Sequence, residues 1–149
     1  MVSNGVLTEW QSGFRPGFST STAATYFVDN VLTGINGRAE SQELTGALFL
    51  DLKKAFDTVD HGILLEKLEN SEVKGTELSW FTSYLSDRSQ VDSIDRHVSE
   101  KEWIMCGVSQ GSILGPLLFS LYGNDIVYAI KRCKIILYAD DTVIYFRDC

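Results

Sequence analysis

The segment Ile135–Phe146, IILYADDTVIYF, constrains the fold of this chain more than any other stretch. It contains two apolar runs that suit short β-strands, with two adjacent aspartates, Asp140 and Asp141, between them. An ionised carboxylate beside buried strands costs free energy unless a positive group pairs with it. The segment therefore predicts two short strands joined by a tight turn at Ala139 and Asp140, with a cation as the partner of the carboxylates.

A third aspartate, Asp51, lies in the apolar run Gly46–Leu52, GALFLDL, which predicts a central strand because both of its faces would be buried. A single aspartate at a strand end is usually a turn former or a helix cap. Three aspartates in two apolar strand regions favour a different interpretation, because neighbouring strands would bring the carboxylates to one point. Mg²⁺ suits such oxygen ligands, and two such ions can stabilise the attacking and leaving oxygens of a displacement at phosphorus.

Helices, strands and loops follow one another along the rest of the chain, without repeats or low-complexity tracts, so we expect one α+β domain. A first helix is predicted after a cap at Ser19-Thr20, with an end near Gly34 or Gly37. Its apolar face would consist of Ala24, Phe27, Val28, Val31 and Ile35. Further helices are predicted at Ile63–Leu68, at Leu78–Leu85 and at about Leu114–Ile130, the last with Pro116 in its first turn. Loops are predicted at Gln11–Phe18 and Gly107–Pro116, and a strand pair at Gln90–Asp95 with Val98–Ile104 across Arg96-His97.

Length, cysteine content and charge limit the possible size class, cellular compartment and partners of the protein. The length of 149 residues fits one compact domain. The three cysteines, Cys106, Cys133 and Cys149, form no CxxC pair, which predicts a reducing compartment and no zinc site. No apolar run is long enough for a membrane span and no signal-peptide pattern is present, so we expect an intracellular protein of the nucleus or cytoplasm that is not secreted and has no membrane partner. The net charge of −7, taken alone, argues against a nucleic-acid partner.

Four ordered blocks nevertheless resemble the reverse transcriptase domain of non-LTR, LINE-like retrotransposons. The blocks are QSGFRPGFSTSTA, similar to the second conserved block of the family, LFLDLKKAFDTVDH, similar to motif A, GVSQGSILGPLLF, similar to motif B, and LYADDTVIY, similar to motif C with YADD as its core. WFTSYLSDRSQ and YGNDI resemble segments found between these blocks. The resemblance implies a polymerase palm, with an antiparallel sheet and a YADD hairpin packed on helices. Residues 1–149 would be a single partial domain, made of part of the fingers plus the palm, with the N-terminal fingers, motif D and the thumb missing.

The resemblance also implies a catalytic role for three aspartates. Asp51 matches the first metal-binding aspartate of motif A, and the backbone carbonyl of Leu52 would face the second metal. Asp140 matches the ligand that both metals share, and Asp141 matches the second aspartate of YADD, which supports the site and is less consistently a ligand. The implied cofactor is Mg²⁺, as two ions, for which Mn²⁺ can substitute.

Other motif positions would bind the nucleotide. Phe56 stands five residues after the motif A aspartate, where the family places the ring that excludes a ribose 2′-hydroxyl. By residue type alone Phe56 would be a core aromatic. Gln110 matches the motif B glutamine, which touches the nascent pair and the template. Gly107 and Gly111 would leave room for the backbone to approach a nucleotide.

Several neighbouring residues have more than one interpretation. Arg15, in GFRP, would contact a phosphate and so help to bind the nucleotide, brace the active-site loops, or be a surface arginine. Lys53 and Lys54 are either solvated residues at a helix start or phosphate contacts. We expect His61 to be a local cap or a core neighbour and not a ligand. Ser109 stands where the family commonly has proline, which would loosen the motif B loop.

The leading hypothesis is an RNA-directed DNA polymerase that transfers a dNTP to a primer 3′-hydroxyl. Its partners would be an RNA template, a DNA primer and the dNTP, together with the remaining fingers and thumb of a full-length polyprotein, which would carry the basic surface. The alternative is a truncated, non-catalytic retroelement relic that keeps the palm fold. A metal nuclease would use similar carboxylates but does not explain Phe56 or the motif B loop. We expect the 149 residues alone to be inactive, because accurate positioning of the reacting groups needs the rest of the protein.

Overall fold

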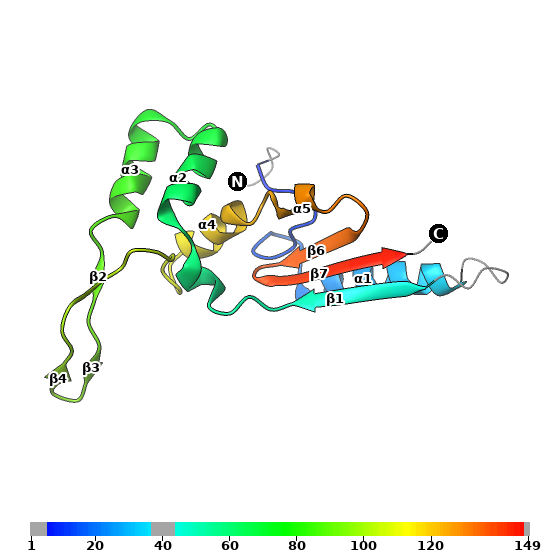
Figure 1. The fold of residues 1–149 in the computed structure, drawn as a ribbon, viewed down its shortest axis with the longest axis horizontal. Coiled ribbons are helices and arrows are strands. Elements are labelled where there is room, and N and C mark those ends of the chain that lie inside the picture. Colours follow the sequence, from blue (N-terminus) through cyan, green and yellow to red (C-terminus); the bar gives the residue numbers. More distant parts are fainter. Residues whose placement is uncertain (1–5, 37–43, 148–149) are drawn as a thin grey trace. The chain divides into compact units, whose positions relative to one another are not determined.

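The computed structural model describes residues 6–36 and 44–147 (Figure 1). In chain order its elements are α1 (Thr20–Asn36), β1 (Thr45–Leu50), the 3₁₀ helix η1 (Ala55–Thr58), α2 (His61–Asn70), α3 (Gly75–Leu85), β2 (Ser89–Gln90), β3 (Ser93–Ile94), β4 (His97–Val98), β5 (Glu102–Trp103), α4 (Leu114–Tyr122), α5 (Ile126–Ala129), β6 (Lys134–Tyr138) and β7 (Asp141–Arg147). The chain divides into two compact units. We call Met1–Lys53 with Gly123–Cys149 the sheet unit, and Lys54–Tyr122 the helical unit.

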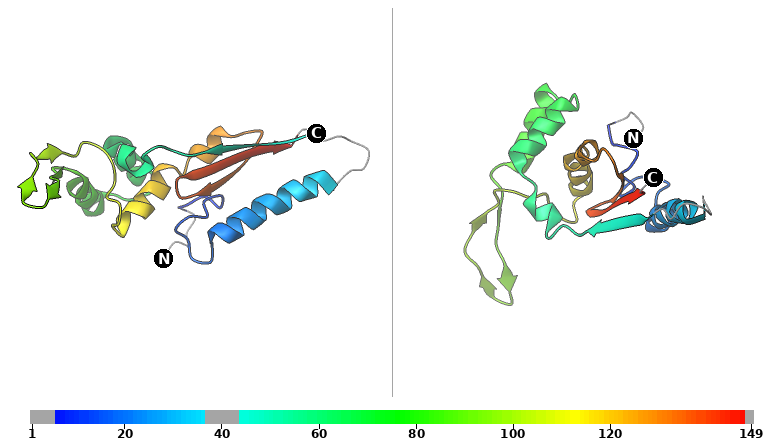
Figure 2. Two further views of the ribbon diagram at one scale, coloured as in Figure 1. Left: turned by 90° about the horizontal axis from the view of Figure 1, so that it is seen from below. Right: turned by 45° about the vertical axis from the view of Figure 1, so that its right-hand side comes forward.

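The sheet unit is built on a three-stranded antiparallel sheet with the order β1-β7-β6. The central strand β7 pairs with β1 on one side and with β6 on the other (Figure 1). Helix α1 runs along the sheet, as Figure 2 shows, and its Phe27 ring lies 5.6 Å from the ring of Phe49 and 5.5 Å from that of Tyr145. Both contacts are edge-to-face, a geometry that aromatic rings prefer. The aromatic side chain of α1 thus fixes the helix on two neighbouring strands.

The prediction that Gly46–Leu52 forms a central strand is wrong, because β1 is an edge strand of this sheet. Its Phe49 side chain is 66% exposed, although the same ring contacts Phe27. A continuous apolar run does not by itself decide the order of strands in a sheet. Here β7 is already paired with β6 through the short turn between them, and its other edge accepts β1. The strand ends at Leu50, so Asp51 lies just beyond it.

The predicted start of α1 is confirmed. The backbone N–H of Thr22 donates to Ser19 Oγ at 3.2 Å, and the backbone N–H of Ser19 donates to Thr22 Oγ1 at 2.8 Å. This reciprocal pair satisfies backbone N–H groups that have no partner within the helix. The helix passes through Gly34 before it ends, while Gly37 lies outside the described residues.

Only part of the predicted apolar face of α1 is buried. Phe27 and Val31 are half-buried, whereas Val28 is exposed and Ile35 is 64% exposed. Periodicity located the helix correctly, but a sheet of three strands covers only one part of its surface.

In the helical unit, α2, α3 and α4 surround an apolar core. Its buried residues are Ala55, Val59, Leu64, Leu68, Leu85, Val108, Leu118, Phe119 and Leu121. The side chain of Asp60 caps α2 by accepting a hydrogen bond from the Ile63 backbone N–H at 2.9 Å. The helices predicted at Ile63–Leu68 and Leu78–Leu85 are confirmed as α2 and α3.

The prediction of one long helix over Leu114–Ile130 is wrong. Helix α4 ends at Tyr122, and the short α5 begins only after Asp125. Between them, Asn124 Oδ1 accepts a hydrogen bond from the Thr8 backbone N–H at 2.7 Å, and Asn124 Nδ2 donates to the carbonyl of Val6 at 2.8 Å. The asparagine amide thus bonds a segment more than a hundred residues away in sequence. The spacing of apolar residues along a helix cannot predict such a contact.

The predicted pairing of the next two segments is confirmed, with the turn one residue earlier. Strand β2 pairs with β5 and β3 pairs with β4, as two separate two-stranded sheets that we together call the β ribbon. Ile94 lies opposite His97, so the turn consists of Asp95 and Arg96 and not of Arg96 and His97. Asp95 has a φ of +54°, which aspartate tolerates better than most residues do.

Within the described residues, no helix is both long enough and apolar enough to cross a membrane. Cys106 is exposed and Cys133 is half-buried, and both are free thiols, while Cys149 lies outside the described residues.

Leu118 and Ser120 on α4 are each 1% exposed and offer a matched test of the core. Leu118 packs in the apolar cluster, whereas the Ser120 hydroxyl has no hydrogen-bond partner in the part of the chain that the structure describes. We predict that Leu118→Ala lowers the free energy of unfolding by about 2–5 kcal/mol. Ser120→Ala should leave it unchanged or raise it, because a buried hydroxyl without a partner is destabilising.

Urea denaturation of the purified chain measures both effects under the same conditions. A loss of more than about 1 kcal/mol in Ser120→Ala would show that the hydroxyl forms a hydrogen bond in solution.

Candidate active site

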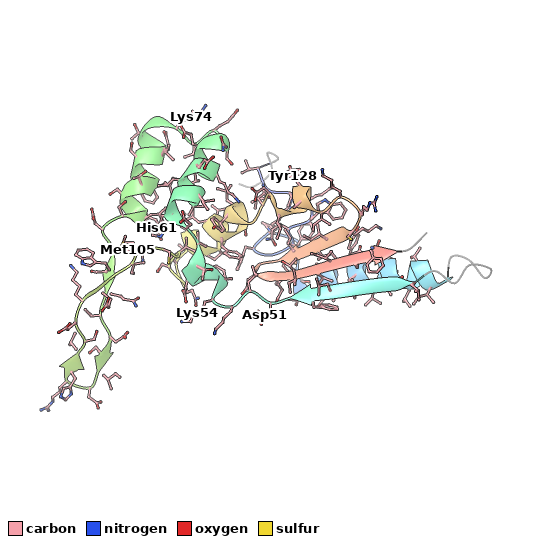
Figure 3. The ribbon with its side chains drawn as sticks, in the orientation of Figure 1. Asp51, Lys54, His61, Lys74, Met105 and Tyr128 are labelled. Carbon is pink, nitrogen blue, oxygen red and sulfur yellow. The ribbon has the colours of Figure 1, made fainter. Side chains whose placement is uncertain are left out.

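The end of β1 places Asp51 beside the last strand of the chain. Leu50, the last residue of β1, lies opposite Thr142 on β7. In an antiparallel pair each further step along one strand is one step back along the other, so Asp51 comes to the level of Asp141. Figure 3 shows Asp51 at this end of β1.

The connection between β6 and β7 places the other carboxylate at the same end of the sheet. Tyr138 on β6 lies opposite Asp141 on β7, and only Ala139 and Asp140 stand between the two strands. One end of the three-stranded sheet therefore carries Asp51, Asp140 and Asp141. Asp51 and Asp141 are exposed, and Asp140 is half-buried.

The donor set at this sheet end fits Mg²⁺ by its chemistry. All three side chains offer carboxylate oxygens, and Leu52 follows Asp51 with its backbone carbonyl. Across residues 6–36 and 44–147, no group of three His, Cys, Asp or Glu side chains is arranged to hold one ion. Mg²⁺ usually takes one or two protein carboxylates and completes its shell with water and substrate phosphates, so it does not need such a protein cage.

The segment before β6 contributes a contact that the sequence did not reveal. Gln11–Phe18 was predicted to be a loop, but Gln11 forms a parallel bridge with Leu137 on β6. The Leu137 backbone N–H donates to the Trp10 carbonyl at 2.9 Å, and the Ser12 backbone N–H donates to the Leu137 carbonyl at 2.7 Å. These bonds attach the second conserved block to the strand that leads into the aspartate turn.

The side chain of Gln11, which is 3% exposed, reaches the turn itself. Its Oε1 accepts hydrogen bonds from the backbone N–H of Gly13 at 2.8 Å and of Ala139 at 3.2 Å. Its Nε2 donates to the Ala139 carbonyl at 3.5 Å. No role was assigned to Gln11 from the sequence. The only signal there was a glutamine two residues before a glycine, and this pattern does not indicate a partner 128 residues away.

Arg15 braces the same segment. Its Nη1 donates to the carbonyls of Thr8 at 3.0 Å and Gln11 at 3.1 Å, and its guanidinium lies 5.0 Å from the centre of the Phe18 ring. These contacts agree with the bracing role, and a phosphate contact of Arg15 stays a prediction.

In the helical unit, Phe56 and Gln110 are held by local contacts. The ring of Phe56 is half-buried and stacks on Phe119 with 4.6 Å between the ring centres, and the Phe56 carbonyl accepts a hydrogen bond from the Val108 backbone N–H at 2.8 Å. Gln110 is exposed, and its Nε2 donates to Asp57 Oδ1 at 3.4 Å. Phe56 therefore has a packing role whatever else it does.

The two glycines of the motif B loop have different surroundings. A Cβ on Gly107, whose φ is +91°, would lie 2.8 Å from the Asp57 carbonyl oxygen, so the close neighbour there is the chain itself and the predicted nucleotide contact is not needed to explain this glycine. Gly111 has a φ of +81° and open space around it. The Gly107 carbonyl lies 2.8 Å from Nε2 of His61, so this histidine bonds the motif B loop, while the cap of α2 expected of it is provided by Asp60.

A cavity of about 550 Å³ opens beside this loop in the helical unit. Its lining includes Lys54, Arg88, Trp103 and Gln110. Lys54 is exposed, and its φ of +54° places it in the left-handed region just before η1. Two basic side chains, one indole and the amide of Gln110 thus line this space.

Comparison with known proteins agrees with the motifs. Residues 1–148 match the family model of the reverse transcriptase (RNA-dependent DNA polymerase). The probable RNA-directed DNA polymerase from transposon X-element of Drosophila melanogaster is 32% identical over 151 residues, which cover 99% of this chain and 16% of that protein. The RNA-directed DNA polymerase from mobile element jockey of Drosophila melanogaster is 31% identical over 145 residues, which cover 93% of this chain and 15% of that protein.

A more distant relative belongs to another element. The retrovirus-related Pol polyprotein from type-1 retrotransposable element R2 of Popillia japonica is 25% identical over 125 residues, covering 75% of this chain and 18% of that protein. The chain thus spans less than a fifth of the length of these relatives. Their names confirm the resemblance to polymerases of non-LTR retrotransposons. The chain belongs to the reverse transcriptase (RNA-dependent DNA polymerase) family.

Proposed function

We propose that this chain is the palm, with part of the fingers, of an RNA-directed DNA polymerase of a non-LTR retrotransposon. The observation that carries the proposal is the register of β7, which brings Asp51 and the Asp140-Asp141 pair to one end of the sheet in a chain of this family. The substrates would be an RNA template, a DNA primer and a dNTP. The relatives are several times longer than this chain, so the working enzyme would be the full-length protein.

The reaction would be a displacement at the α-phosphorus of the dNTP. The 3′-oxygen of the primer forms the new bond to phosphorus, its proton leaves, and the bond to the β-phosphate oxygen breaks to release pyrophosphate. Asp51 and Asp140 would hold two Mg²⁺ ions, with the Leu52 carbonyl as a neutral ligand and Asp141 in support. Bound Mg²⁺ would stabilise negative charge on the attacking and leaving oxygens.

Charge explains why further segments would be needed to bind the nucleic acid. The chain has a net charge of −7, and carboxylates without bound cations repel phosphates. Binding of template and primer gains most of its affinity from phosphate contacts with basic residues. We therefore propose that the fingers and thumb of the full-length protein supply most of this basic surface.

The helical unit would contribute the nucleotide contacts. Phe56 would limit the space beside the sugar of the incoming nucleotide, which favours dNTP over rNTP. Gln110 and Gly111 would contact the nascent pair, and the open space around Gly111 is compatible with this. Arg15 would act through the loop that it braces, since its guanidinium already bonds two carbonyls.

Substitution of the proposed metal ligands tests the function. In the full-length protein, Asp51→Asn and Asp140→Asn should each lower the rate of primer elongation on RNA by more than about 100-fold. Mutation of a residue that only hydrogen-bonds to a metal ligand can already lower activity by up to about 100-fold, and loss of the ligand itself should lower it further. Asp92→Asn, at an exposed aspartate of the β ribbon, is the matched control and should elongate normally.

Each rate is measured with a primed RNA template, dNTPs and Mg²⁺. Normal elongation by Asp140→Asn would contradict the assignment of the metal site. A wild-type protein that does not elongate at all would favour the non-catalytic relic.

A second test concerns the choice of sugar. Phe56→Ala should raise the incorporation of rNTP relative to dNTP by at least about tenfold, because removal of the ring opens space for a 2′-hydroxyl. Phe119→Leu is the control, since it removes the same ring stack but leaves Phe56 in place. Single-nucleotide incorporation by the full-length variants gives both ratios. If Phe56→Ala still makes DNA with unchanged sugar preference, Phe56 is a core residue only.

A further inference from the structure

The turn that carries Asp140 has a backbone conformation that needs support. Ala139, the residue before Asp140, has a φ of +57°, in the left-handed region that residues with a Cβ disfavour. The last pair of the hairpin joins Tyr138 and Asp141, so the ladder holds the flanks of the turn and leaves the peptide groups of Ala139 to other partners. The position of Asp140 therefore depends on what bonds Ala139.

One side chain bonds both backbone groups of Ala139. Gln11 Oε1 accepts from the Ala139 N–H at 3.2 Å, and Gln11 Nε2 donates to the Ala139 carbonyl at 3.5 Å. The primary amide is the neutral side-chain group that presents an acceptor and donors side by side. The same Oε1 accepts from the Gly13 N–H at 2.8 Å, which fixes the amide in its orientation.

The support beneath this amide is itself fixed. The segment on either side of Gln11 is hydrogen-bonded to both backbone groups of Leu137 on β6, and the Gln11 side chain is almost fully buried. A Cβ on Gly13 would lie only 2.2 Å from the Ala139 nitrogen, so only glycine lets the segment approach the turn this closely. The backbone of Gln11 is thus held against the edge of β6, and its side chain extends from a fixed position.

We infer that Gln11, with Gly13, is a positioning residue for Asp140. Its amide holds the Ala139 peptide in the left-handed conformation and so sets the direction in which the next residue presents its carboxylate. The inference rests on the proposed function, because it concerns the same aspartate. A displacement of a metal ligand by about 1 Å is enough to weaken a catalytic site strongly. Loss of the Gln11 amide would displace Asp140 in this way, so we expect it to weaken the binding of Mg²⁺ more than it destabilises the fold.

The first measurement needs no metal and no activity. In the full-length protein, Gln11→Met keeps the length of the side chain but removes its donors and acceptor. Hydrogen exchange followed by mass spectrometry should show at least tenfold faster exchange in the peptide spanning Leu137–Thr142, with the rest of β7 unchanged. Asn70→Met, at an exposed residue of α2, controls for the introduction of methionine and should change neither segment.

The second measurement separates positioning from folding. The Mg²⁺ concentration that gives half the maximal elongation rate should rise at least fivefold in Gln11→Met, whereas a purely structural role would lower the yield of active protein and leave this concentration unchanged. Unchanged exchange in the turn, or a Mg²⁺ requirement within twofold of wild type, would overturn the inference.

The outcomes also distinguish this inference from the proposed function. A wild-type protein that fails to elongate refutes the function, and the exchange measurement still shows whether the clamp exists. If Gln11→Met does not fold, Gln11→Asn keeps the amide on a shorter side chain that cannot reach Ala139, and the same two measurements decide.

Discussion

The register of β7 is the constraint on which the rest of the sheet unit depends. Its residues pair with β1 from Thr45 opposite Arg147 to Leu50 opposite Thr142, and with β6 from Lys134 opposite Tyr145 to Tyr138 opposite Asp141. A slip of one residue would turn every side chain of the strand to the other face of the sheet. The buried Tyr145 ring, which lies edge-to-face on Phe27 of α1, resists such a slip, and the same register fixes the level of the aspartates.

Polar groups extend this constraint to the N-terminal block. Buried amides and backbone groups are destabilising without partners, and here they bond one another in a chain that leads from Arg15 to Gln11 and from Gln11 to Ala139. Each member is held by the one before it. The segment around Gln11 therefore contacts the turn before Asp140, although more than a hundred residues separate the two in sequence.

The helical unit combines packing with the proposed contacts of the nucleotide. Phe56 stacks on Phe119 and packs against the apolar core, and it is half-buried. The stack restricts the motion of the Phe56 ring, and in the proposed role a restricted ring would reject a hydroxyl group that a mobile side chain would accommodate.

The sequence by itself determined the local elements: the start of α1 at Ser19, the helices α2 and α3, and the ribbon pairing. It also identified the family, while the metal-binding role of the three aspartates stays a proposal. Periodicity and short-range capping decide these features, and both depend on residues that lie close together in the sequence. Only the tertiary structure decided the edge position of β1, the end of α4 before Asn124 and the bond from Gln11 to Ala139. Each of these depends on a partner far away in the chain, because a residue's pattern shows that it needs burial or a hydrogen bond but not which distant group provides it.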